Sequence, residues 1–478
     1  MWWIIVPFAA AAFLAVLLLR AAAFRPPSEI KPEPDTVEAD GSRAVESLAA
    51  MVRCRTVSRQ DHDAEDADEF ENFRDLLRRR YPAIHNSCIL DHVGRNGLLY
   101  KWPGKRAAAP SVFMAHYDVV PADPATWSKP PFDGILENGV LWGRGTLDTK
   151  GTLAGILEAA EQLIGQGFVP ENDIYLAFSG EEEIAGDSAS EIVSALEARG
   201  VVKGLVLDEG GAVVEGVFPG VTAPCALIGT GEKGQSAIYM EMESSGGHAS
   251  APPSHSIAGL LAAAAVRIES RPFPFRLTPP AAEMFDTLGR HSTFGMRLIF
   301  ANLWLFRGVL DRICRKSGGE LNALVRTTVA VTEMWGSSAN NVLPPRAGIG
   351  LNVRLMGGDT SGAAVERLRR ISGNPDIAFR KGVSSEPSAF SVTGDDAAWL
   401  RLKDAVSRTW PEAIVSPYLM IAGSDSRHYC RISRNVYRFS AMALSGEERA
   451  LIHANDERIP VEKLLKCVQF YIRLLQSC

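Results

Sequence analysis

Histidine and carboxylate side chains in this chain follow directly after apolar stretches of the kind that form buried strands. His116 and Asp118 follow residues 111–115, and an extended backbone points their two side chains the same way. Asp118 can then hold His116 in the tautomer that presents its other ring nitrogen to a metal ion. A structural hydrogen bond would leave the same pattern, so this pair alone does not establish a metal site.

Two acidic clusters have the same position relative to a strand. The glutamates at 181–183 follow residues 173–178, and Asp208 follows residues 205–207. Adjacent carboxylates repel one another, so a cation would stabilise them, although a solvated run of charge is the alternative interpretation. Two neighbouring carboxylates can also divide the chemistry, one as a metal ligand and the other as a general base.

Asp148 lies in a glycine-rich turn just before a predicted helix. Gly143, Gly145 and Gly151 let the backbone fold tightly around it, and apolar residues at helical spacing predict a helix over 152–164. A carboxylate at this position is often only a helix cap. Ligands of open α/β sheets, however, bind beyond the carboxyl ends of the strands, which is where the histidine and carboxylate clusters fall. A mixed set of histidine and carboxylate ligands with one shared aspartate suits a pair of zinc ions.

The elements that position these residues alternate between strand and helix. Strands are expected at 97–102, 111–115, 173–178 and 205–207, and helices from about residue 43 and at 73–81, 152–164, 397–409 and 461–475. This alternation predicts an α/β fold, with a mostly parallel sheet flanked by helices.

The pattern changes after residue 229 to that of an inserted α+β unit. Strands are expected at 236–243, 327–333 and 348–355, helices at 257–269 and 363–371, and a long, irregular, partly apolar segment up to about residue 322. The predicted division is therefore a catalytic domain at 43–231 and 386–478, and an inserted lid at 232–385.

Composition excludes some functions. The 478 residues carry a net charge of −6 with no long basic run, which argues against a nucleic-acid partner. The seven cysteines are scattered and include no Cys-x-x-Cys pair, so neither a disulfide framework nor a zinc ribbon is expected.

The N-terminus indicates membrane attachment. Residues 2–19 carry no charge and precede Arg20 and Arg25, which is near the minimum length for a membrane-spanning helix. Residues 21–23 are alanines that could form a signal-peptidase site, so secretion after cleavage is the alternative. We expect a single-pass anchor within 1–24, followed by a Pro-rich, charged linker at 25–42.

Taken together, the motifs resemble the di-zinc peptidase family of carboxypeptidase S, aminoacylase, glutamate carboxypeptidase and succinyl-diaminopimelate desuccinylase. The resemblance covers roughly residues 45–475, and its landmarks lie at 114–121, 143–148, 181–183, 208–211, 247–250 and 424–427. It is strongest to carboxypeptidase S and the secreted N-fatty-acyl-amino-acid hydrolases, whose tryptophan-containing insertion is similar to residues 302–306.

The resemblance implies two zinc ions per subunit. By position, Asp148 would bridge the two ions. His116 and Asp208 would complete one site, and Glu183 and His453 would complete the other. The resemblance also implies a cis peptide bond between Asp148 and Thr149.

The remaining roles follow from the same resemblance. Glu182 would be the general base, Asp118 would orient His116, and His248 would stabilise the oxyanion, reaching the active site of a partner subunit. The residues expected to bind the substrate are Asn341, Arg354 and Ser424.

The resemblance therefore implies a membrane-anchored zinc metallopeptidase that cleaves an amide bond next to a free carboxylate. Its substrates would be short peptides with a C-terminal residue to remove, or N-acyl amino acids, and the lid would mediate a homodimer. An aminoacylase-type deacylase and a non-catalytic metal-binding protein are the alternatives.

Overall fold

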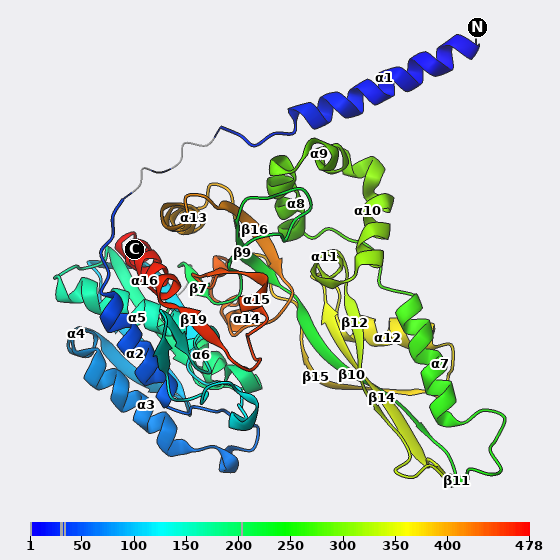
Figure 1. Cartoon of the computed structure of the whole chain (residues 1–478), viewed down its shortest axis with the longest axis horizontal. Coiled ribbons are helices and arrows are strands. Elements are labelled where there is room, and N and C mark those ends of the chain that lie inside the picture. The colour runs from blue at the N-terminus through cyan, green and yellow to red at the C-terminus, as the bar shows by residue number, and fades with distance from the viewer. Residues whose placement is uncertain (1, 29–31, 33–34, 202–203) are drawn as a thin grey trace.

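A ten-stranded sheet forms the centre of the protein in the computed structural model, which describes residues 2–28, 32, 35–201 and 204–478 (Figure 1). The strand order is β1-β2-β6-β3-β7-β17-β9-β8-β18, and β16 pairs with β9. The strands are β1 (Ile89–Val93), β2 (Gly97–Trp102), β3 (Arg106–His116), β6 (Asn172–Ser179), β7 (Val206–Asp208), β8 (Val213–Val214), β9 (Cys225–Glu232), β16 (Ile414–Met420), β17 (Val436–Arg438) and β18 (Ala443–Leu444). The middle strands β6, β3, β7 and β17 are parallel, which confirms the predicted α/β class.

Both faces of this sheet are covered by helices. The helices are α2 (Gly41–Arg53), α3 (Ala67–Arg80), α4 (Pro82–Ser87), α5 (Lys150–Gly165), α6 (Ser188–Ala198), α13 (Ala397–Thr409), α14 (Ser426–Tyr429), α15 (Gly446–Arg449) and α16 (Val461–Gln476). Alternate residues of β3 enter different cores: Phe113 packs on the side of α5 and α16, and Met114 packs on the side of α6 and α14. A strand buried on both faces is continuously apolar, which explains the run at 111–115.

Smaller elements border the sheet. A three-stranded sheet contains β4 (Ile135–Glu137), β5 (Val140–Trp142) and β19 (Arg458–Pro460). Short 3₁₀ helices occupy His62–Ala64, Pro124–Thr126 and Glu182–Ile184. The α5 and α16 helices pack closely at Gly155, where a β-carbon would lie 2.5 Å from the sulfur of Cys467.

The lid has its own antiparallel sheet, in the order β12-β14-β10-β15. Its elements are β10 (Gly234–Glu243), β12 (Thr328–Trp335), β14 (Arg346–Leu355), β15 (Ala378–Ser385), α7 (Ile257–Ser270) and α12 (Ser361–Ser372). Residues of β10 alternate between buried and partly exposed, and the buried ones join a core separate from that of the large sheet. Two short strands, β11 (Gly247–His248) and β13 (Val342–Leu343), pair at the far end of the lid (Figure 1).

The segment expected to be irregular is helical, so that prediction is wrong. It forms α8 (Pro279–His291), α9 (Phe294–Phe300), α10 (Leu303–Ser317) and α11 (Gly319–Ala323). Proline occupies the first two positions of α8, where it favours the start of a helix, but the mixed composition of the segment hid this signal. The α8 helix packs on β16, and its Met284, Phe285 and Leu288 join the core of the large sheet. We propose that residues 232–385 form the inserted unit and that the packing of α8 attaches this unit to the catalytic domain.

The N-terminal helix α1 (Trp2–Ala23) projects from the body of the protein beside α9 (Figure 1). Its segment Val6–Ala23 is long and apolar enough to cross a membrane, and a signal sequence has the same properties. Of the predicted linker at 25–42, residues 29–31 and 33–34 lie outside the described part of the chain.

Candidate active site

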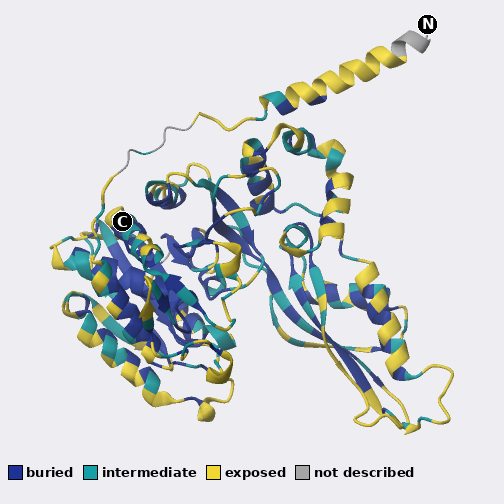
Figure 2. Ribbon diagram, viewed as in Figure 1, coloured by how far each residue is buried: buried dark blue, intermediate teal, exposed yellow. Residues whose placement is uncertain are grey.

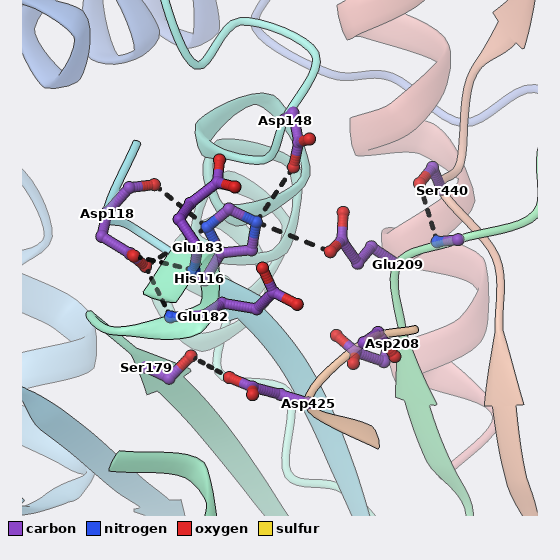
Figure 3. Close-up of polar contacts among 12 residues, drawn as sticks. His116, Asp118, Asp148, Ser179, Glu182, Glu183, Asp208, Glu209, Asp425 and Ser440 are labelled. Carbon is purple, nitrogen blue, oxygen red and sulfur yellow. Dashed lines mark hydrogen bonds and ion pairs between the residues drawn. The ribbon is translucent and has the colours of Figure 1, made fainter. Parts of the chain in front are cut away.

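Three neighbouring strands bring the acidic and histidine side chains together at one edge of the large sheet (Figure 3). His116 is the last residue of β3, level with Ser179 at the end of β6. Glu182 and Glu183 follow in the turn after β6, and Glu209 follows β7. The parallel strands therefore end where ligands bind in open α/β sheets.

Asp148 lies between two imidazole rings. Its Oδ1 is 2.9 Å from Nε2 of His116, and its Oδ2 is 2.9 Å from Nε2 of His453. Glu183 approaches the second ring, with Oε2 3.0 Å from Nε2 of His453. Burial raises the pKa of Asp148, but hydrogen bonds from His116 and His453 outweigh it and hold that pKa well below its usual range. Each carboxylate oxygen of Asp148 thus faces a different histidine, which is the arrangement a bridging ligand requires.

The prediction for Asp208 needs correction, because the neighbouring Glu209 occupies the expected position. Glu209 Oε1 lies 3.5 Å from Nε2 of His116, whereas Asp208 is buried with its Oδ2 accepting a hydrogen bond from the Ser426 amide at 2.9 Å. Side chains alternate along β7, so Asp208 shares the face of Val206, which α14 covers. Burial and the nearby Asp148 raise the pKa of Glu209 to about 8, although His116 opposes them.

Asp118 positions both the histidine and the glutamates. Its backbone carbonyl lies 3.0 Å from Nδ1 of His116, and its carboxylate lies 3.4 Å from the same atom. The carboxylate also accepts hydrogen bonds from the backbone amides of Glu182 and Glu183, both at 3.1 Å, and from the Ser58 hydroxyl at 2.6 Å. With Nδ1 held in this way, Nε2 of His116 faces Asp148 and Glu209; in the neutral tautomer protonated on Nδ1, its lone pair would be free to bind a metal ion placed between them.

Glu457 fixes the loop that carries Asp148, a role that the sequence reasoning missed. It is fully buried and accepts hydrogen bonds from the amides of Gly145, Leu147 and Asp148 and from the Arg144 guanidinium. The only signal in the sequence is its position four residues after His453. The predicted cis peptide bond between Asp148 and Thr149 is present.

Glu182 is partly buried near other acids of the cluster. Burial raises its pKa well above the usual value, His116 opposes this shift, and Asp425, Glu209 and Asp148 add to it. Asp425, which the sequence reasoning did not select, accepts a hydrogen bond from the Ser179 hydroxyl at 2.6 Å, and burial raises its pKa to about 7.

Two predicted residues lie at the far end of the lid. His248 belongs to β11 and is exposed, with its Nδ1 accepting a hydrogen bond from the Ser250 amide. Asn341 is exposed beside it, where its carbonyl accepts from the Ala249 amide. Arg354 lies at the opposite end of β14, so roughly 30 Å of strand separates it from the lid tip. Within one chain these three side chains therefore do not converge on one substrate.

Ser424 also needs correction as a substrate-binding residue. It is fully buried, and its hydroxyl lies 2.7 Å from the Ser426 hydroxyl and 3.4 Å from Glu232. Glu232 in turn forms a buried ion pair with Arg438. The hydroxyl of Ser424 therefore supports this polar network behind Asp208 instead of facing a substrate.

The donor atoms fit a metal centre. The ligand atoms of His116, Asp148 and Glu183 lie within 4.8 Å of one another, and so do those of His116, Glu182 and Glu209. Glu183 Oε1 is buried without a hydrogen-bond partner, a costly arrangement unless a cation is near. Mixed imidazole and carboxylate donors are those that zinc accepts.

The sequence is similar to those of known proteins. The sequence model described as peptidase family M20/M25/M40 matches residues 112–477. The chain is 34% identical over 448 residues to the N-fatty-acyl-amino acid synthase/hydrolase PM20D1 of Xenopus tropicalis, covering 93% of this chain and 87% of that protein. It is 32% identical to the probable carboxypeptidase S-like 2 of Dictyostelium discoideum, covering 90% and 84%.

The fold resembles solved structures at low sequence identity. An M20 family metallo-carboxypeptidase from Sulfolobus solfataricus superposes with a TM-score of 0.64 at 18% identity, covering 91% of this chain and 98% of that one. At this level of identity, the similarity concerns the fold.

Proposed function

Since this chain belongs to peptidase family M20/M25/M40 and is a metal-dependent hydrolase, we propose that it uses two zinc ions to cleave the amide bond of N-acyl amino acids or short peptides. The observation that carries the proposal is Asp148, whose two carboxylate oxygens each lie 2.9 Å from a different imidazole. That geometry supports one shared carboxylate between two metal ions.

The residues of the strand-end cluster divide into two ligand sets around Asp148. His116 and Glu209 would complete one set, and Glu183 and His453 would complete the other. Zinc ions bound there would supply Lewis-acid chemistry, activating water and polarising the amide carbonyl. The buried side chain of Glu183 supports this assignment, because a buried carboxylate needs a cation or a full set of hydrogen bonds.

Glu182 acts as the general base in this proposal. Its backbone amide is fixed by Asp118, and its partly buried carboxylate belongs to the group formed with His116 and Glu209. Glu182 accepts a proton from the attacking water and later donates it to the leaving amine. Proton transfer by a positioned carboxylate contributes about 100- to 10,000-fold to the rate of such reactions.

The lid supplies the remaining groups. The exposed position of His248 supports a role in the active site of a second copy of the chain, where its imidazole would donate a hydrogen bond to the developing oxyanion. Asn341, next to His248, would enter the same site, and Arg354 would bind the substrate carboxylate, which arginine can engage bidentately. A homodimer through residues 232–385 follows from this arrangement.

The preferred substrates are N-acyl amino acids with a fatty acyl chain, because a relative that is 34% identical carries that activity in its name. Removal of a C-terminal residue from short peptides is the second candidate, favoured by the carboxypeptidase S-like relative. Both reactions place a free carboxylate next to the cleaved amide bond. Retention of α1 as a single-pass anchor would keep the enzyme at a membrane, where fatty acyl compounds partition.

The test is an assay of purified, zinc-loaded full-length protein on matched compounds. The panel pairs N-acyl amino acids of increasing chain length with dipeptides that share the same C-terminal residue, and includes carboxamides of each as controls. We expect turnover of the free acids and little turnover of the carboxamides. The proposal fails if no member is hydrolysed, or if blocking the carboxylate leaves turnover unchanged.

A further inference from the structure

One face of α10 exposes large apolar side chains to solvent. Trp304 is 61% exposed, Leu305 42%, Val309 44% and Ile313 43%, and the last three lie at successive i, i+4 positions of the helix. Leu305, Val309 and Ile313 are called the α10 stripe, and Trp304, at the start of the helix, lies about 100° around the axis from Leu305. Scattered single apolar residues are common on protein surfaces, but a stripe along one helix marks an interaction surface.

The start of α10, beside the α10 stripe, contacts the candidate membrane helix α1. The rings of Phe13 and Trp304 meet edge to face at a centroid distance of 6.1 Å. Arg20 donates hydrogen bonds to the side chain of Asn302 at 3.0 Å and to the carbonyl of Ala301, and Asn302 donates to the Leu17 carbonyl. Figure 1 shows α9 beside the C-terminal part of α1. The apolar surface of α1 therefore passes directly onto α10.

Both helices expose apolar side chains to solvent. Figure 2 shows exposed residues along most of the described part of α1 and along α10. Phe8 in α1 is 75% exposed, whereas Leu17 and Ala21, which face α9, are buried. A membrane around α1 would therefore reach the start of α10, because Trp304 already contacts Phe13 in the middle of the anchor.

Charge on α9 and α10 fits an anionic lipid surface. The cationic residues of these two helices are Arg297, Arg307, Arg312, Arg315 and Lys316. Their one acidic residue, Asp311, forms ion pairs with Arg315 and Arg326. Arg312 and Lys316 lie three positions after Val309 and Ile313, on the same side of α10, so basic and apolar side chains share its exposed surface. Tryptophan, apolar and long basic side chains together are typical of segments in the interfacial region of a bilayer, where the basic groups reach the headgroups.

We propose that the α10 stripe inserts into the lipid leaflet at the C-terminal end of α1, so that the protein contacts the bilayer through two elements. This inference rests on the proposed attachment through α1. The α1 helix anchors the chain, and α10 fixes the orientation of the lid and the adjoining domain relative to the membrane. The basic side chains of α9 and α10 contact anionic headgroups.

The test uses photo-crosslinking of the full-length chain in vesicles of phosphatidylcholine and phosphatidylglycerol. The photoreactive residue p-benzoylphenylalanine replaces Val309 or Ile313 on the stripe, Phe8 on α1, or Val383 on β15, which is 80% exposed. Adducts are identified by mass spectrometry. We expect lipid adducts from Phe8, Val309 and Ile313, a lower yield from Val309 in phosphatidylcholine alone, and none above background from Val383.

The four positions of the photoreactive residue distinguish failure of the α10 contact from failure of the anchor. Lipid adducts from Phe8 with none from Val309 and Ile313 would overturn the α10 contact and leave the anchor in place. Absence of lipid adducts from Phe8 as well would overturn both proposals. Adducts between two protein chains at Val309 would show that the stripe is an interface between copies, which also contradicts membrane insertion.

Discussion

The strand-end cluster and the lid tip differ in how much one chain completes by itself. The cluster, formed by His116, Asp148, Glu182, Glu183, Glu209 and His453, lies on elements whose positions the buried sheet determines. The lid tip, formed by β11, β13, His248 and Asn341, consists of two-residue strands with exposed side chains. In the proposed active site, the metal-binding half is therefore assembled within the chain, and the oxyanion-binding half would come from a second copy.

Removal of the metal should have the largest effect on activity, and it should affect the strand-end cluster but not the lid. Dialysis against a strong chelator should abolish hydrolysis, because the cluster would lose the cations that its carboxylates require. The lid, whose core is separate, should keep its secondary structure. The measurements are activity and circular dichroism before and after zinc is restored. Full activity in protein shown by metal analysis to be metal-free would contradict the account.

Replacing the proposed base should have the next largest effect. Glu182→Gln keeps the size of the side chain and removes its basicity, so kcat should fall by about 100- to 10,000-fold with unchanged zinc content. Glu171→Gln, on the surface, is the matched control. Loss of zinc from the Glu182→Gln protein would show that Glu182 is instead a metal ligand.

The lid tip is tested by complementation between two inactive chains. His248→Ala should lower kcat by about 100-fold, as expected for loss of an oxyanion donor. If His248 acts across subunits, random pairing of His248→Ala and Glu182→Gln chains restores about a quarter of wild-type activity, because half of the dimers gain one intact site. No recovery in mixtures shown to exchange subunits would place His248 in the active site of its own chain.

A smaller effect is expected from the residue that holds the loop of Asp148. Glu457→Gln replaces a carboxylate that accepts three backbone amides and the Arg144 guanidinium, and it should lower zinc affinity or kcat by about 10- to 100-fold. Glu462→Gln, exposed on α16, should change neither. An effect on thermal stability alone, with normal zinc affinity and kcat, would reduce Glu457 to a structural residue.

How much of the fold and of the site could be predicted from the sequence depends on how far apart in the chain the interacting residues lie. The strands at 97–102 and 173–178 were predicted because burial leaves continuous apolar runs. The choice between Asp208 and Glu209 was not predicted, because it depends on the residue at which β7 ends. A shift of one position moves a side chain to the opposite face of the sheet. Glu457 was missed because its loop partners lie about 310 positions away in sequence, beyond the reach of any local pattern.

The helices α9 and α10 were missed for a related reason. Their apolar residues lie both in the core and on the surface, since Phe300 and Leu310 are buried whereas Trp304 and Ile313 are exposed. A helix with apolar residues on more than one side lacks the single stripe on which prediction relies. The same feature makes α10 a candidate for membrane contact.

The central claim, that one carboxylate joins two metal ions at the edge of the sheet, is tested most directly by anomalous diffraction from crystals of the zinc-loaded protein. We predict two zinc peaks about 3.5 Å apart, with Asp148 between them, His116 and Glu209 on one, and Glu183 and His453 on the other. A single peak, or two peaks that Asp148 does not bridge, would contradict the account.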